Sequence, residues 1–190
     1  MGIGKVFGEY NMLDFEYVWK LSLRDTDISQ HLVVLYGLVL SIKAKTILEI
    51  GAGQSTYTLT AAANENNGQF YSIDLTKEAR ERLYPEAPDL DKEERYHFIQ
   101  GNSLEVKWDK QIDFLFIDSG HAYDLTLKEM DKYLPFVVEK GIVCMHDTGE
   151  FNNVFFDCRK AMLDYVGKNP VWNYRTLSNQ NGLSILRRKI

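Results

Sequence analysis

The stretch from Thr46 to Thr56, TILEIGAGQST, decides the fold. It is an apolar run of strand length that ends in two closely spaced glycines and continues into a helical pattern. Glycine lets the backbone take unusual torsion angles and approach a ligand closely. In an open parallel sheet, ligands bind beyond the carboxyl ends of the strands, and the turn after the first strand is the usual anchor. The stretch therefore predicts a buried first strand and a ligand site around residues 49–56.

The same alternation of strand and helix continues along the chain. We expect further strands at residues 69–73, 96–100, 112–117 and 141–145, and helices at residues 28–42, 56–65, 77–83, 123–133 and 153–166. Two closing strands, 171–177 and 183–188, flank a polar turn ending in Asn181-Gly182, which predicts an antiparallel pair. The sequence thus predicts an α/β, Rossmann-like three-layer sandwich with a mostly parallel seven-stranded sheet.

The chain of 190 residues has the size of a single domain. We expect its core at residues 28–190, with Asp25 or Asp27 capping the first core helix. Residues 1–27 hold a cluster of aromatic side chains, and the sequence leaves open whether they form a packed arm or a lid. Residues 84–94 are acidic and contain two prolines, which predicts a solvated loop.

Composition and charge restrict the kind of partner. The formal net charge is −5 and the chain has no concentrated basic face, which disfavours nucleic acid because binding to phosphate is largely electrostatic. No apolar run approaches the ~20 residues of a membrane span, so we expect no membrane partner and a cytoplasmic location. Cys144 and Cys158 lie in apolar and helical patterns, which indicates buried thiols and no disulfide framework.

The residues around the glycine loop discriminate between cofactors. A dinucleotide fingerprint has Gly or Ala where this chain has Thr56, and the acid Glu49 would repel a pyrophosphate. The same acid suits the ammonium group of a zwitterionic amino acid whose carboxylate meets the loop, and S-adenosylmethionine carries both groups. Ser55 or Thr56 can cap the following helix and direct its N–H groups at an anion.

Two later strands end in polar residues at the same edge. Asp74 closes the second strand, where its carboxylate can accept hydrogen bonds from both ribose hydroxyls of an adenosine ligand. Asn102 and Ser103 follow the third strand and could contact the adenine ring, although a plain polar turn explains them equally well.

Titratable residues gather after the fourth and fifth strands. Asp118 and His121 follow the fourth strand, and His146 and Asp147 end the fifth. A protein that needs only stability has little reason to concentrate such groups on one rim, so this placement indicates chemistry. We expect His31 and His97, in a helix and a strand, to be structural.

The ordered set of motifs resembles the class I S-adenosylmethionine-dependent methyltransferases over residues 28–188. The resemblance rests on E-x-G-x-G-x-S/T after the first strand, an Asp ending the second and an Asp ending the fourth. The wording FIDSGHAY followed by HDT is similar to a small O-methyltransferase subfamily that includes antibiotic-sugar O-methyltransferases, with metal-dependent catechol-type enzymes as more distant relatives. This chain departs from many members by having Asn102 in place of Asp, and from metal-dependent relatives by having His146 in place of a second acid.

The resemblance implies a cofactor site and a reacting site. The cofactor residues would be Glu49, Gly51, Ala52, Gly53, Ser55, Thr56, Asp74, Asn102, Ser103 and Asp118. Asp118 and Asp147, with His146, would hold Mg²⁺ or a softer divalent cation, and Thr148 or water would complete its shell. His121, together with Asp118, would form the catalytic pair, with His121 as general base.

These residues predict O-methylation of a small hydroxylated molecule. A chain this short must build its acceptor pocket from rim loops, the aromatic arm, Phe151, Phe155 and Phe156, or a neighbouring subunit, and a homodimer would supply the last of these. Two other functions fit the same fold: an NAD(P)-dependent oxidoreductase, and a non-catalytic protein that binds S-adenosylmethionine.

Overall fold

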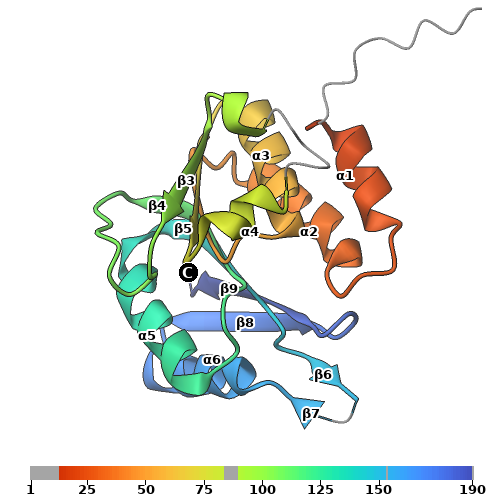
Figure 1. The fold of residues 1–190 in the computed structure, drawn as a ribbon. Coiled ribbons are helices and arrows are strands. Elements are labelled where there is room, and N and C mark those ends of the chain that lie inside the picture. The colour runs from red at the N-terminus through yellow and green to blue at the C-terminus, as the bar shows by residue number, and fades with distance from the viewer. Residues whose placement is uncertain (1–12, 84–89, 153, 190) are drawn as a thin grey trace, which may run out of the picture.

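The computed structural model describes residues 13–83, 90–152 and 154–189. Its centre is a seven-stranded sheet with the order β3-β2-β1-β4-β5-β9-β8 (Figure 1). The strands are β1 (Thr46–Ile50), β2 (Gln69–Asp74), β3 (Tyr96–Gln100), β4 (Ile112–Ile117), β5 (Val137–His146), β8 (Trp172–Leu177) and β9 (Leu183–Arg188). The first five run parallel, and β9 pairs antiparallel with both β5 and β8. The predicted fold class is confirmed.

Helices cover both faces of this sheet and make the outer two layers. They are α1 (Phe15–Ser22), α2 (Ser29–Ser41), α3 (Gln54–Asn66), α4 (Lys77–Glu81), α5 (Tyr123–Tyr133) and α6 (Asp157–Lys168). In Figure 1, α1, α2 and α3 group on one side of the sheet, and α5 and α6 lie on the other. The strand order reverses between β1 and β4, so the carboxyl ends of these two strands form a switch point where ligands bind in sheets of this kind.

Alternate residues of the central strands face opposite layers. Ile47 and Phe114 pack with α1, α2 and α3, whereas Leu48 and Leu115 pack with α5 and α6. All four side chains are fully buried. A parallel strand covered on both faces is a continuous apolar run, which is why the sequence located these strands well.

The N-terminal part of the prediction needs one correction, at the start of α2, and gains one detail, in the arm. Part of the expected arm, from Phe15 to Ser22, is a helix, α1, whose Val18 and Leu21 are buried. Helix α2 is preceded by Ile28 with no side-chain cap, so neither Asp25 nor Asp27 caps it. Two residues of the aromatic cluster predicted in residues 1–27, Phe7 and Tyr10, lie outside the described residues.

Three further segments differ from expectation. Residues before Asp157 do not begin the last helix; they form a hairpin of β6 (Glu150–Phe151) and β7 (Val154–Phe155). Strand β5 begins at Val137, earlier than predicted, across an irregularity in its pairing with β4. Leu90 is fully buried in a short 3-10 turn, so the expected solvated loop is anchored to the core at that point.

Other expectations at this level are confirmed. Cys144 and Cys158 are buried free thiols, and burial raises the pKa of both. The turn between β8 and β9 does bend left-handed, with φ of 61° at Asn181 and 86° at Gly182. Within the described ranges, the helices are too short or too polar for any of them to traverse a bilayer.

Candidate active site and cofactor cavity

The two glycines of the loop after β1, Gly51 and Gly53, have different backbone conformations and different surroundings. Gly51 has a φ of 96°, and a Cβ there would collide with the backbone oxygen of Asp118 in the loop after β4. Gly53 precedes α3 in an extended conformation, and a Cβ there would meet no described protein atom within 4 Å. The protein's own packing therefore requires glycine at 51, whereas at 53 there is open space.

Glu49 is fully buried beneath this loop. Its carboxylate accepts hydrogen bonds from Ser55 Oγ at 2.5 Å, Thr56 Oγ1 at 2.7 Å and Ser72 Oγ at 2.6 Å. Burial raises its pKa to about 7, although the three hydroxyls act in the opposite direction. Through these contacts Glu49 joins β1, β2 and the first turn of α3, and its contact with a ligand ammonium stays a prediction.

Ser55 and Thr56 differ in part from expectation, because neither is the N-cap residue although the Thr56 side chain belongs to the capping box of α3. Both are buried within the first turn of α3, and the residue that caps this helix is Gly53. Thr56 Oγ1 accepts a hydrogen bond from the Gly53 N–H at 3.1 Å while it donates to Glu49. Their hydroxyls are thus used to shape the loop, which leaves the backbone and Gly53 to face a ligand.

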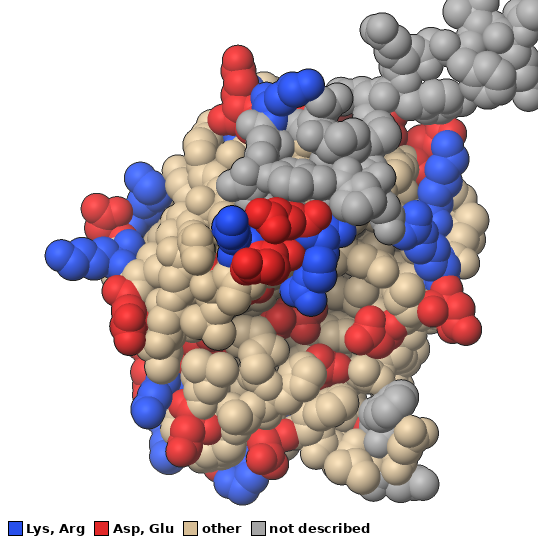
Figure 2. Space-filling view, in the orientation of Figure 1, with Lys and Arg blue, Asp and Glu red and all other residues tan. Residues whose placement is uncertain are grey.

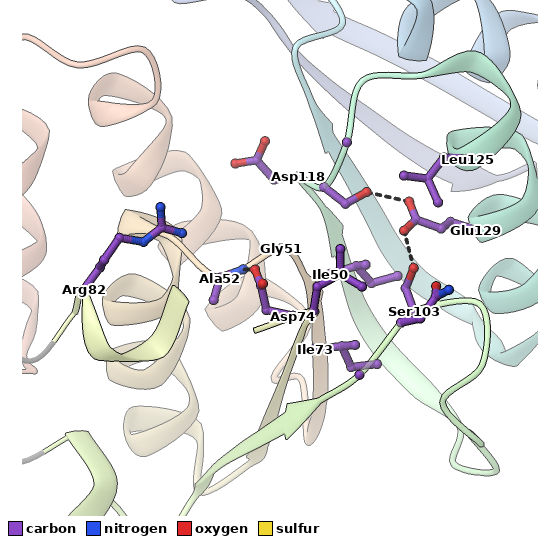
Figure 3. Close-up of a pocket in the computed structure, with 15 residues that line it drawn as sticks. Ile50, Gly51, Ala52, Ile73, Asp74, Arg82, Ser103, Asp118, Leu125 and Glu129 are labelled. Atoms are coloured by element: carbon purple, nitrogen blue, oxygen red, sulfur yellow. Dashed lines mark hydrogen bonds between the residues drawn. The ribbon is translucent and has the colours of Figure 1, made fainter. Parts of the chain in front are cut away.

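A cavity of about 320 Å³ opens at the carboxyl ends of β1, β2, β3 and β4. Figure 3 shows side chains from all four loops around it. Asp74 holds the loop in place by accepting a hydrogen bond from the Ala52 N–H at 3.0 Å. The predicted residues that line it are Gly51, Ala52, Asp74, Asn102, Ser103 and Asp118.

Sequence reasoning missed Glu129, which also lines this cavity. The residue lies on α5, is fully buried, and accepts hydrogen bonds from Ser103 Oγ and Ser119 Oγ, each at 2.6 Å (Figure 3). Burial raises its pKa, against the effect of the two hydroxyls and Lys132. A signal was present, because Glu129 shares the inward face of α5 with the buried residues Thr126, Met130 and Tyr133 at helical spacing.

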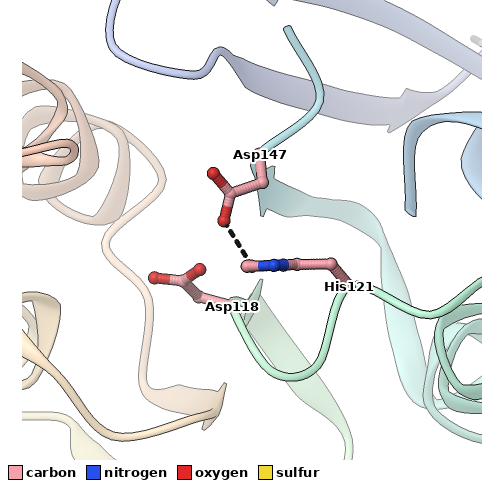
Figure 4. Close-up of side chains that lie close together, drawn as sticks. All are labelled: Asp118, His121 and Asp147. Atoms are coloured by element: carbon pink, nitrogen blue, oxygen red, sulfur yellow. Dashed lines mark ion pairs between the residues drawn. The ribbon is translucent and has the colours of Figure 1, made fainter. Parts of the chain in front are cut away.

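Three titratable side chains converge beside the cavity. Asp118 follows β4, His121 lies three residues on, and Asp147 follows β5; one ligand atom from each lies within 4.8 Å of the others. His121 Nε2 lies 2.6 Å from Asp147 Oδ2 (Figure 4). Asp147 takes a φ of 54°, an unusual conformation that aspartate tolerates. Tertiary structure therefore assembles the three residues that the sequence placed on this rim.

His146 lies behind this cluster. Its Nδ1 is 3.6 Å from Asp118 Oδ1 and 3.4 Å from Asp147 Oδ2, and its ring packs edge-on against His31. Burial lowers the pKa of His146, but the two carboxylates outweigh burial and raise it to about 10. His31 is buried without such acids in contact, and burial lowers its pKa to about 4. His146 is thus the inner charge partner of both acids.

Neighbouring loops fix the position of Asp147. The N–H groups of Thr148 and Gly149 donate to the carbonyl oxygens of Gly182 and Asn181 in the turn between β8 and β9. Thr148 is fully buried and its Oγ1 is 3.3 Å from the Met145 carbonyl, so it does not join the cluster as expected.

The open side of the cluster faces aromatic residues that precede α6. The Phe156 ring lies 4.8 Å from the His121 ring, and Phe155 is 49% exposed on the β6–β7 hairpin. Of Phe151, also expected in the acceptor pocket, only the backbone is described, as part of β6.

This sheet order, with a glycine loop, a cavity at the switch point and a titratable cluster at its end, defines a Rossmann-like methyltransferase. Residues 48–148, more than half of the chain, match the family model described as "Methyltransferase domain". The chain belongs to this family and is an S-adenosylmethionine-dependent methyltransferase.

Solved structures share the fold at low sequence identity. An O-methyltransferase from Bacillus cereus in complex with S-adenosylhomocysteine (SAH) has 16% identity and a TM-score of 0.69, over 97% of this chain and 94% of that chain. An SAH-bound methyltransferase from Podospora anserina has 13% identity and a TM-score of 0.66, over 92% and 87%. A Staphylococcus aureus protein provisionally named a caffeoyl-CoA O-methyltransferase has 22% identity and a TM-score of 0.67, over 92% and 89%. No curated protein matches the chain.

Proposed function

We propose that this protein transfers the methyl group of S-adenosylmethionine to a hydroxyl oxygen of a small molecule, with the help of a divalent cation. The observation that carries the proposal is the position of Asp118, which lines the cavity after β1 and also belongs to the cluster with His121 and Asp147. S-adenosylmethionine in the cavity and a methyl acceptor at the cluster would therefore both lie next to Asp118.

The cofactor would occupy the cavity of about 320 Å³. Asp74 would accept hydrogen bonds from the ribose hydroxyls, and Asn102 and Ser103 would meet the adenine ring. The open space at Gly53 lets the amino acid end approach the N-terminus of α3, where the helix dipole favours a carboxylate. Glu49, Ser55 and Thr56 would support this loop from below.

The cluster would prepare the acceptor. A hydroxyl becomes an effective nucleophile when a base removes its proton. Its oxygen must also lie in line with the bond between the methyl carbon and the sulfur. His121 is the base in this proposal because its imidazole is exposed and Asp147 Oδ2, 2.6 Å from Nε2, orients it. Asp118 would orient the acceptor from the side of the cofactor.

The donor set also fits a divalent cation. Two carboxylates and an imidazole converge, and among the described residues the buried Asp147 Oδ1 and His146 Nε2 have no hydrogen-bond partner. Asp118 and Asp147 would hold the ion, with His146 behind both carboxylates and His121 left free to act as the base. A bound cation would orient acceptor oxygens and lower the pKa of the reacting hydroxyl. Mixed oxygen and nitrogen ligands suit Mn²⁺, Fe²⁺ or Zn²⁺ as well as Mg²⁺.

Methyl transfer to a panel of catechols, sugars and other hydroxylated molecules tests this proposal. We expect product from at least one acceptor, a loss on EDTA treatment, and recovery with Mg²⁺ or Mn²⁺. His121→Ala should lower kcat ~10²–10⁴-fold with little change in the KM for S-adenosylmethionine. The surface variant Lys20→Ala, on α1, serves as the matched control. Normal SAH binding without turnover of any acceptor would favour a non-catalytic binding protein.

The partner and location predictions belong to the same proposal. We propose a small-molecule acceptor, no nucleic-acid or membrane partner, a cytoplasmic protein, and a homodimer that could complete the acceptor pocket. On the face shown in Figure 2, acidic and basic side chains are interspersed and no broad basic patch appears on its described part. Analytical ultracentrifugation would test the dimer.

A further inference from the structure

Glu129 is a buried carboxylate for which methyl transfer has no direct use. It lies in the cavity wall between Ser103 in the loop after β3 and Ser119 in the loop after β4 (Figure 3). Each serine contributes to the same wall, and each hydroxyl is 2.6 Å from one oxygen of Glu129. The carboxylate therefore connects two loops that enclose the same part of the cavity.

This connection determines the direction of the serine hydrogen bonds. A carboxylate has no proton to donate, so both serine hydroxyls must donate to Glu129. A hydroxyl has one proton and two lone pairs, and with its proton used each serine can offer only lone pairs to the cavity. The polar wall that Ser103 and Ser119 form is consequently an acceptor for hydrogen bonds.

The position of Ser103 is itself rigid. Its carbonyl oxygen accepts hydrogen bonds from Tyr133 OH at 2.5 Å and from Lys132 Nζ at 2.6 Å, both on α5. Glu129 lies on the same helix, so the C-terminal part of α5 holds both the backbone and the side chain of this serine. Lys132 also supplies positive charge that favours the ionised form of Glu129.

We propose that Glu129 makes the cavity selective for a 6-aminopurine by orienting Ser103 and Ser119. This inference rests on the proposed S-adenosylmethionine site. The exocyclic amino group of adenine has two N–H bonds, one for the lone pairs of each serine, whereas hypoxanthine has a single N–H at N1 on this edge and its 6-oxo group would face an acceptor. Glu129 is thus a positioning residue that acts through the serines.

Isothermal titration with SAH and its 6-oxo analogue, S-inosyl-L-homocysteine, tests the inference. We expect wild-type protein to bind SAH more tightly by a factor of ~10 or more, the usual effect of an unpaired buried polar group. Glu129→Gln should reduce this ratio to below about threefold, because the Gln amide donates to one serine and forces that hydroxyl to donate into the cavity.

Two further variants separate the outcomes. Ser119→Ala should reduce the ratio partway, and Ser184→Ala, which removes a buried serine hydroxyl bonded to Thr176 on β8, should leave it unchanged. Circular dichroism would verify that each variant is folded. Equal binding of both ligands by wild type, or an unchanged ratio in Glu129→Gln, would overturn the inference. If wild type binds neither ligand, the proposed cofactor site fails instead.

Discussion

Gly51 and Gly53 give a matched test at the scale of single residues. Gly51→Ala should reduce the free energy of unfolding by ~2 kcal/mol or more, because a Cβ there collides with the Asp118 backbone at a φ of 96°. Gly53→Ala should change stability by less than ~1 kcal/mol, since no described protein atom lies within 4 Å of its Cβ. Urea unfolding measures both.

At Gly53 we expect substitution to affect SAH affinity more than stability. Gly53→Val, with a larger side chain in the open space, should weaken SAH binding ~10-fold or more while the fold stays intact. Wild-type affinity in Gly53→Val would contradict the placement of the cofactor over this loop.

Glu49 makes stability depend on pH. Its pKa is about 7 in the folded protein, against 4.5 for an unperturbed glutamate, so between these values the folded state holds a proton that the unfolded chain releases. Its contribution is therefore fully present below pH 4.5 and is lost as pH rises to 7, with a slope of at most ~1.4 kcal/mol per pH unit.

Glu49→Gln tests this by removing the titrating group. Urea unfolding at a series of pH values from 4.5 to 8 should show that wild type loses stability relative to the variant across the range and that the difference levels off above pH 7. Parallel curves for the two proteins would show that Glu49 is already ionised throughout.

At the scale of elements, Phe156, the residue after the β6–β7 hairpin, contacts the cluster of Asp118, His121 and Asp147. Phe156 packs its ring on His121, and the hairpin leaves Val154 and Phe155 exposed. Phe156→Ala should raise the KM of the acceptor several-fold and change SAH affinity little, because Phe156 does not line the cofactor cavity. Leu177→Ala, an exposed apolar residue at the end of β8, is a control for the loss of apolar surface.

The turn between β8 and β9 is the second element that shapes the site. Gln180 Oε1 accepts a hydrogen bond from the Gln30 N–H of α2, and Asn179 donates to the Gln30 side chain. Together with the bonds from Thr148 and Gly149, these contacts hold the strand end that carries Asp147 against α2. The last strands of the chain therefore help to fix the position of Asp147 in its cluster with Asp118 and His121.

At the scale of the whole molecule, cofactor binding should stabilise the fold. A ligand that binds only the folded state adds ~2.7 kcal/mol at a concentration 100 times its Kd. SAH should therefore raise Tm by several degrees for a domain of this size. Asp74→Ala should abolish much of this shift, whereas NADH should produce none. An equal shift with NADH would contradict the assignment of the cavity.

The sequence by itself determined the seven strands of the main sheet, apart from the start of β5, together with the edge that they share and the residues on that rim. It did so because strands buried on both faces must be apolar throughout, and because parallel strands bring their carboxyl ends to one side. Asp74, Asp118, His121 and Asp147 were found in this way. Strands of two residues, such as those of the β6–β7 hairpin, are too short to carry a periodic signal, so the sequence-based prediction extended the last helix back over β7.

Only the tertiary structure decided which groups surround the buried carboxylates of Glu49 and Glu129. Glu49 and Glu129 are both fully buried and held by hydroxyls, yet only Glu129 lines the cavity. Their partners come from other strands and loops, and the orientation of a side chain depends on these packed neighbours and not on its place in a motif. For the same reason, the sequence predicted a ligand site at the loop from 49 to 56, but only the packing of Glu49 showed that this acid supports the loop from below.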